Sequence, residues 1–192
     1  MTQYARPDGF TPDIESNWEG DHTDVDNTDD PTGTGADSDY IESAATDCSM
    51  TLTLGDTITD PETGADHKLY FRFKRDDGGG SASSSDVTLT VSLKEGGSTR
   101  ATRVITGDTT PAIGSSFTYN SAASGATGFN LTTGEANSIS NYNNLTVDIV
   151  YLDNEDSDYL FISQVVLECP DAGGGSTAVP VALNTYRQMR EN

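Results

Sequence analysis

Hydrophobic and polar residues alternate along much of the chain from Asp39 onward. Successive side chains of a β-strand point to opposite faces, so a period of two predicts strands that are buried on one side. The stretch at 145–151, LTVDIVY, shows the pattern clearly. The other apolar positions in this phase are Cys48, Met50, Leu52 and Leu54; Leu69, Phe71 and Phe73; Val87, Leu89, Val91 and Leu93; and, on the last strand, Phe161, Val165, Leu167 and Cys169.

Turn-forming residues separate these segments. Asp, Asn, Pro and Gly, which favour turns, gather at 60–64, 76–80, 95–97 and 153–156. Weaker strands are expected at 40–45, 99–106 and 115–120, and one helical turn at 134–139. No helices alternate with the strands. The pattern therefore predicts an all-β fold, an antiparallel β-sandwich of about eight short strands.

The two ends of the chain lack this period. Residues 1–36 are rich in proline and aspartate, which predicts an extended N-terminal arm with Phe10, Ile14 and Trp18 as apolar anchors. After Pro170 a Gly-rich linker leads into a C-terminal arm. The expected organisation is an arm at 1–36, a sandwich at 37–170, and a linker with a C-terminal arm at 171–192.

The C-terminal arm is apolar and locally basic on an acidic chain, so we expect it to pack against protein. It either adds to another subunit or returns to its own sandwich, and we favour the first. The residues predicted to contact a partner are Trp18, Val179, Val181, Leu183, Tyr186, Arg187, Met189 and Arg190.

Charge excludes several classes of partner. The 192 residues carry 31 acidic and 10 basic side chains, a formal net charge of −21. A field of this sign repels nucleic-acid phosphates and anionic lipid surfaces, so we expect neither nucleic acid nor membrane as a partner. An acidic, lysine-poor surface also suits a protein that must stay hydrated in molar salt, which favours a halophilic origin. The N-terminus has no apolar segment of the kind found in signal peptides.

Candidate chemistry is sparse. Cys48 and Cys169 fall in phase with inner strand faces that are neighbours in many sandwiches, so the sulfurs are either reduced and buried or bridged, and we favour reduced thiols. His67 is expected to cap a turn or lie on the surface. The acidic loops 24–29 and 153–158 lack the EF-hand pattern, so solvated surface is favoured over a structural calcium site. With no catalytic constellation, the sequence predicts that the chain is not an enzyme and needs no cofactor.

Basic residues gather on two predicted strands: Arg72, Lys74 and Arg75 on one, and Arg100 and Arg103 on another. Ordinary cross-strand pairing with aspartate is the favoured interpretation. The other interpretation is an interface patch.

Three stretches resemble the small jelly-roll virion structural proteins of tailed phages and archaeal tailed viruses. They are RPD at 6–8 with Trp18 and DYI at 39–41; HKLYFR at 67–72 with LTVSLKEG at 89–96; and ISNYNNL at 139–145 with VVLE at 165–168. The likeness spans roughly residues 6–170. This chain has Asn141 and Asn143 where the family often has Asp, and no catalytic residue is transferred from the family.

The resemblance implies a sandwich of jelly-roll type and a structural role in a virus particle. We therefore predict a capsid decoration or cement protein, assembled in the host cytoplasm, whose arms hold neighbouring subunits together. Its expected partners are the major capsid protein or other virion subunits and further copies of itself, with a trimer expected. The alternative is a carbohydrate-binding or host-adhesion module of a virion fibre or tail. That alternative requires exposed aromatic side chains, for which the candidates are Tyr70, Tyr119, Tyr142, Tyr151 and Tyr159.

Overall fold

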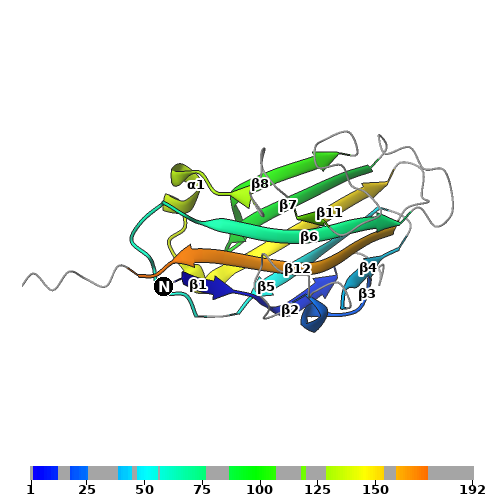
Figure 1. The fold of residues 1–192 in the computed structure, drawn as a ribbon, viewed down its shortest axis with the longest axis horizontal. Helices are drawn as coiled ribbons and strands as arrows, with labels where there is room; N and C mark the ends of the chain where they lie inside the picture. Colours follow the sequence, from blue (N-terminus) through cyan, green and yellow to red (C-terminus); the bar gives the residue numbers. More distant parts are fainter. Residues whose placement is uncertain are drawn as a thin grey trace, which may run out of the picture.

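The alternating segments of the sequence become strands of two antiparallel sheets that lie one over the other (Figure 1), so the predicted antiparallel β-sandwich is confirmed. The structure is a computed structural model. It describes residues 2–12, 18–25, 39–44, 47–55, 57–76, 87–106, 118–119, 129–153 and 159–172.

The five-stranded sheet contains the strongest alternating segments. Its strands lie in the order β2-β5-β11-β7-β8, and every neighbouring pair is antiparallel. The strands are β2 (Pro7–Pro12), β5 (Cys48–Leu54), β7 (Val87–Glu95), β8 (Ser98–Thr106) and β11 (Leu145–Asp153). Within the described part of the chain, β2 and β8 therefore form its two edges.

The seven-stranded sheet is organised around β12, which runs from Tyr159 to Pro170. One side of β12 pairs with β6, and the other side pairs with β4 and β1. The other strands of this sheet are β1 (Thr2–Ala5), β3 (Trp18–Glu19), β4 (Ile41–Ser43), β6 (Lys68–Asp76), β9 (Thr118–Tyr119) and β10 (Phe129–Asn130). In Figure 1, β6 and β12 lie in front of β7, β11 and β5.

Successive strands from β4 to β7 alternate between the two sheets, and so do β11 and β12. This is the connectivity of a jelly roll, as expected. The inward side chains of the two sheets fill the space between them. Leu52, Val147 and Phe71 are completely buried there. Burial of one such side chain stabilises the fold by about 1.5–3 kcal/mol.

Short helices close one end of the sandwich. Helix α1 (Thr133–Asn137) and the 3-10 turn η3 (Tyr142–Asn144) lead into β11, which matches the expected helical turn at 134–139. A second 3-10 turn, η1 (His22–Asp24), follows β3. The strands expected at 40–45, 99–106 and 115–120 correspond to β4, β8 and β9.

The turn expected at 95–97 is the tight connection between β7 and β8. Glu95 pairs with Ser98, and the residues between them are Gly96 at φ 54° and Gly97 at φ 84°. Two consecutive residues with positive φ match the twist of a hairpin, and glycine adopts that conformation without a clash from Cβ.

The prediction of an extended arm at 1–36 is wrong for the residues that the structure describes there. Thr2–Ala5 pairs with the end of β12, and Pro7–Pro12 pairs with β5. The prolines that indicated an arm are compatible with β2 because it is an edge strand, where a missing N–H on the outer side breaks no ladder. The predicted anchor Ile14, the acidic loop 26–36 and the tail after Ala172 lie outside the described residues.

A β-bulge in β12 corrects a second expectation. The pairing register between β12 and β6 shifts between Ile162 and Gln164. Phe161 therefore lies opposite Lys74, on the outer side of the sheet, and is not part of the main core. Val165, Leu167 and Cys169 point inward as predicted.

Candidate functional site

The outer side of the five-stranded sheet is a surface dominated by threonine. Along β5, β7 and β11, buried side chains alternate with half-buried or exposed ones, and the latter point away from the core. We call this surface the threonine face. Its members are Ser49, Thr51, Thr53, Thr88, Thr90, Ser92, Lys94, Thr99, Thr102, Val104, Thr106, Thr146, Asp148, Val150 and Leu152.

Strand pairing arranges these side chains in rows across the sheet. Thr51 lies opposite Asp148, Asp148 opposite Ser92, and Ser92 opposite Thr102. The Thr51 hydroxyl donates to Asp148 Oδ1 over 3.0 Å, and the hydroxyls of Ser92 and Thr102 are 3.0 Å apart. Cross-strand contacts of this kind stabilise a sheet and order its surface. The polar groups of this row therefore largely satisfy one another.

The threonine face carries almost no net charge. Among its members, the charged residues are Lys94 and Asp148, which form an ion pair with each other. Arg100 and Arg103 of β8 pair instead with Glu95 and Glu135. A neutral surface spanning four strands is therefore present on a chain whose net charge is −21.

One end of the threonine face is apolar. Val104 is 57% exposed and Leu152 is 41% exposed. Val104 and Val150 both lie opposite Thr90 in the rows, and Leu152 lies opposite Thr88. Tyr40, at 37%, is the other large hydrophobic residue exposed in the described part of the chain. An aliphatic spot within a neutral, hydroxyl-rich surface is suited to contact with protein.

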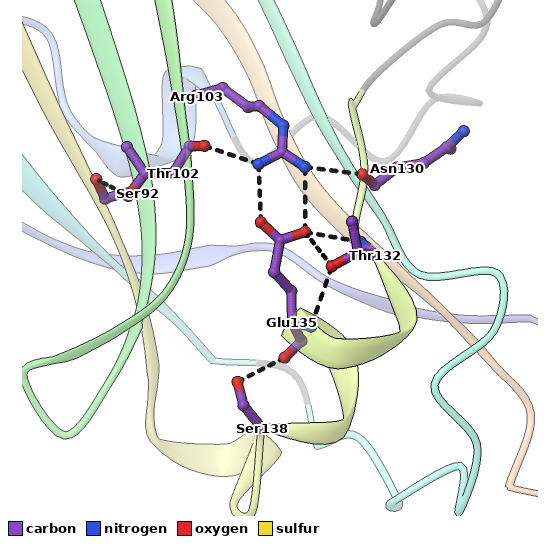
Figure 2. Close-up of polar contacts among 7 residues, drawn as sticks. All are labelled: Ser92, Thr102, Arg103, Asn130, Thr132, Glu135 and Ser138. Atoms are coloured by element: carbon purple, nitrogen blue, oxygen red, sulfur yellow. Dashed lines mark hydrogen bonds and ion pairs between the residues drawn. The ribbon is translucent and has the colours of Figure 1, made fainter.

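A polar cluster at the edge of the sandwich holds the two sheets and α1 together (Figure 2). Arg103 of β8 forms a bidentate pair with Glu135, with distances of 2.9 and 3.1 Å, and also donates to the carbonyl of Asn130. Thr132, the N-cap of α1, donates to the same carboxylate through its N–H and its hydroxyl. The guanidinium also lies 4.8 Å from the centre of the Phe129 ring of β10.

These contacts keep Glu135 ionised. The Arg103 hydrogen bonds, reinforced by those from Thr132, lower the pKa of Glu135 to about 2 despite partial burial. Oε1 accepts from Arg103 and Oε2 accepts from Arg103 and Thr132, so donors of the same chain bind both carboxylate oxygens. The cluster therefore joins β8, β10 and α1, and we assign it a structural role.

Glu95 has a similar role at the β7–β8 hairpin. Ser140 donates to it through its N–H at 3.0 Å and its hydroxyl at 2.6 Å, and Arg100 donates at 2.9 Å. Burial opposes ionisation, but these bonds and the positive charge of Arg100 lower the pKa of Glu95. Arg100 and Arg103 thus pair with glutamates, whereas the expected partner was aspartate. Lys94 with Asp148 is a cross-strand pair of the expected kind.

The expectation that His67 lies on the surface is wrong, whereas its bond to the carbonyl of Ala65, in the bend before β6, is a turn cap of the expected kind. Its side chain is fully buried, with Nδ1 2.9 Å from the carbonyl of Ala65 and Nε2 2.8 Å from the hydroxyl of Tyr142. A carbonyl can only accept, so Nδ1 carries the proton and Nε2 accepts from Tyr142. Burial lowers the pKa of His67 and raises that of Tyr142. Both side chains are neutral and fill the end of the core.

The cysteines are free and buried, so the preference for reduced thiols is confirmed. The expectation that they are neighbours is wrong, because β5 and β12 belong to different sheets. Ala5 pairs with Leu167, and Pro7, two residues further along the chain, pairs with Leu54. Cys169 therefore lies near the end of β5 that Leu54 occupies. Cys48 lies at the other end of β5, about 20 Å away along the strand.

Trp18 is in the core, which fits its predicted role as an apolar anchor, and its role as a partner contact stays a prediction. Its side chain is 7% exposed, and its indole N–H donates to the carbonyl of Ser49 over 3.1 Å. This bond connects β3 of one sheet to β5 of the other. The remaining predicted contact residues, Val179, Val181, Leu183, Tyr186, Arg187, Met189 and Arg190, lie outside the described residues, so their role stays a prediction.

The aromatic residues offer little for sugar binding in the described part of the chain. Tyr70, Tyr142 and Tyr151 are buried, and Tyr159 is half-buried. Nothing is known of the Tyr119 side chain, which lies outside the described residues. The exposed Tyr40 packs edge-on against Phe161, with the Lys74 ammonium 5.6 Å from its ring centre. These positions do not form the row of exposed rings that the alternative function requires.

The expected absence of a metal site and of catalysis stays a prediction. Where side chains are described, no group of three His, Cys, Asp or Glu residues is placed to hold a metal ion. Most of the acidic loops 24–29 and 153–158 lies outside that part. No described helix is long and apolar enough to cross a membrane. The expectation that the chain is not an enzyme is left as a prediction.

Comparison of the chain with solved structures gives a distant likeness. No family model and no curated protein matches the chain. Among solved structures, it is similar to the crystal structure of the CBM36-1 domain of a multidomain xylanase from the hindgut metagenome of Trinervitermes trinervoides. The identity is 16%, the TM-score is 0.38, and the match covers 90% of this chain and 99% of that chain. A likeness of this degree assigns neither a ligand nor an activity to this protein.

Sequence reasoning did not single out the threonine face as a candidate functional surface. Its residues appeared as the polar half of the alternation and were interpreted as solvent-facing. The signal was the near absence of aspartate and glutamate from those positions in a chain with 31 acidic residues.

Proposed function

We propose that the protein is a structural component of a virus particle, a decoration or cement protein that acts by packing against neighbouring subunits. The observation that carries the proposal is the neutral threonine face on a strongly acidic chain. The sequence resemblance to jelly-roll virion proteins supports the same function. The contacts of the described polar clusters, which are satisfied within the chain, fit a scaffold better than a catalyst.

Charge explains why one neutral face matters for assembly. Two acidic subunits repel each other, and like charges buried opposite one another disfavour an interface by several kcal/mol. Lys94 and Asp148 neutralise each other on the threonine face, so a neighbour approaching there meets no excess charge. Threonine methyl groups and the valines supply apolar contact, while the hydroxyls stay compatible with water before assembly.

High salt complements this arrangement. The Debye length falls to about 3 Å at 1 M salt, so the repulsion between acidic surfaces is screened. We propose that the particle forms in a salt-rich environment. On this view the melting temperature of the isolated protein rises from dilute buffer to molar salt, and a melting temperature independent of salt contradicts it.

The tail supplies a second attachment in the proposed function. Pro170 lies opposite Thr2, so the chain leaves the seven-stranded sheet beside its own first strand. A truncation ending at Asp171 removes no residue of any described strand. It should stay folded and lose incorporation into particles. If the truncated chain unfolds instead, the tail belongs to its own sandwich.

Particle composition tests the function directly. Particles purified from the source culture by density gradient should contain this chain at high copy number, measured by quantitative mass spectrometry, and surface labelling should reach it. A chain found free in the lysate and absent from particles overturns the proposal. Binding to a glycan array by the free protein, with no particle association, would favour the carbohydrate-binding alternative.

A further inference from the structure

We propose that the occupant of the threonine face is a second copy of this chain, packed face to face about a two-fold axis. The inference rests on the proposed function, because it names the neighbour that the face binds. A two-fold interface uses the same surface on both subunits, so that surface must be complementary to itself. The threonine face meets this condition in charge, in shape and in area.

The charges are self-complementary. Lys94 of β7 and Asp148 of β11 lie on the two central strands of the four that form the face, one row apart. A two-fold axis parallel to the strands and midway between β7 and β11 places β7 of one copy over β11 of the other. Lys94 of each copy then lies over Thr146 of the other, one row along the strand from the Asp148 of that copy, so two cations and two anions sum to zero at the centre of the interface. The same axis places Leu152 and Val150 of one copy over threonines of the other.

The shape suits sheet-on-sheet packing. Most members of the face are β-branched or small, with Lys94 and Leu152 as the longer side chains. The strands of aligned sheets pack within about 30° of each other. Val104 and Leu152, both well exposed in the single chain, become covered in the pair.

The area is sufficient. Strands β7, β8 and β11 each have nine residues. At about 3.3 Å per residue and about 4.8 Å between strands, the four strands cover a surface of about 30 by 19 Å. Two copies therefore bury about 1,200 Å² in total, the lower bound of stable protein interfaces. An interface of this size forms a reversible dimer that salt strengthens, because salt screens the repulsion between two chains of net charge −21.

Charge swapping between chains tests the inference. Lys94→Asp gives a face with two anions, and Asp148→Lys gives a face with two cations. Each variant alone should dimerise at least tenfold more weakly than the natural chain. An equimolar mixture should recover the dimer, because each chain then supplies the sign that the other lacks. Sedimentation equilibrium of the full-length chains measures all three, and near-UV circular dichroism checks that each variant is folded.

A third variant tests the position of the interface without touching the ion pair. Thr90→Asp adds one negative charge at the centre of the threonine face. Thr133→Asp adds the same charge on the exposed side of α1, away from the face, and serves as the matched control. The first should weaken the dimer at least tenfold at molar salt, and the second should leave it unchanged.

Three results would overturn the inference: a natural chain that stays monomeric from dilute to molar salt, a Thr90→Asp variant that dimerises normally, or a mixture that does not recover. These outcomes are distinct from failure of the proposed function. A chain that is monomeric in solution but present in purified particles removes the dimer and keeps the structural role. A chain that forms the dimer in solution but is absent from purified particles keeps the dimer and removes the structural role.

Discussion

Replacing Glu135 by glutamine should lower stability by an amount that depends on pH. The carboxylate receives hydrogen bonds from both terminal nitrogens of Arg103 and from the N–H and hydroxyl of Thr132. Glutamine keeps the shape of the Glu135 side chain but removes its negative charge. Its NH2 group, itself a donor, then faces the donors of Arg103 or Thr132. Hydrogen bonds to a charged group contribute about 1.5–3 kcal/mol, so Glu135→Gln should lower the free energy of unfolding by about 2–3 kcal/mol at pH 7.

The lowered pKa of Glu135 reflects the same hydrogen bonds and leads to a similar magnitude. It is lowered from 4.5 to about 2 in the folded protein. Each pKa unit corresponds to about 1.4 kcal/mol, so the shift stabilises the fold by about 3 kcal/mol when the unfolded chain is fully ionised. A lowered pKa stabilises above the unfolded value and loses its effect as pH falls toward the folded value. The contribution of Glu135 is therefore complete above pH 4.5 and disappears progressively toward pH 2.

Urea unfolding at constant molar salt measures this effect. Other acids titrate over the same range, so the useful quantity is the difference between the natural chain and Glu135→Gln at each pH. That difference should be largest at pH 7 and shrink as pH falls from 4.5 toward 2. Glu19→Gln, at an exposed carboxylate of β3, makes the same chemical change as a control and should alter stability by less than about 0.5 kcal/mol. A difference that is constant across pH would refute the reasoning.

Three further predictions concern the core. Burial lowers the pKa of His67 below its ordinary 6.5, so the natural chain loses stability as pH falls below 6.5. In His67→Gln the melting temperature should fall less steeply over the same pH range, as measured by thermal melts. Trp18→Phe leaves the Ser49 carbonyl without its donor and should cost about 1–3 kcal/mol, whereas Trp18→Ala should cost about 3–5 kcal/mol. Burial raises the pKa of Cys48 and of Cys169 to about 12, so neither thiol should react with maleimide at pH 8 until urea unfolds the chain. Mass spectrometry of the maleimide-treated native protein tests this, and rapid labelling would contradict it.

Local alternation was enough to predict the strands whose one face is buried. β5, β7 and β11 follow from their apolar positions, because a period of two specifies both the strand and its inner side. β2 was missed because Pro7 and Gly9 are turn residues locally, and only its position at a sheet edge makes them acceptable. The outward turn of Phe161 depends on a bulge, which has no signature in the alternation.

The polar contacts were harder to predict than the strands. His67 finds its partner in Tyr142, 75 positions along the chain, and nothing in either local sequence indicates the bond. The Arg103–Glu135 pair likewise depends on how β8 and α1 meet. The neutrality of the threonine face emerges only when four strands are placed in register, because Lys94 and Asp148 neutralise each other across strands. Long-range register is the information that a single sequence lacks.

The pairing of β1 with the end of β12 affects how this chain folds as the ribosome makes it. Thr2 meets Pro170, so the first strand has no partner until nearly the whole sandwich has been synthesised. Contacts between such distant positions give a high contact order, which slows folding to the range of milliseconds to seconds. The sheet therefore closes only after Pro170 has been synthesised, and until then the edge of β1 that pairs with β12 is open to other chains. A fusion partner placed before Thr2 would lie next to the strand pair that forms last. New termini in the β7–β8 turn, with the present ends joined, would make β1 and β12 neighbours in the sequence.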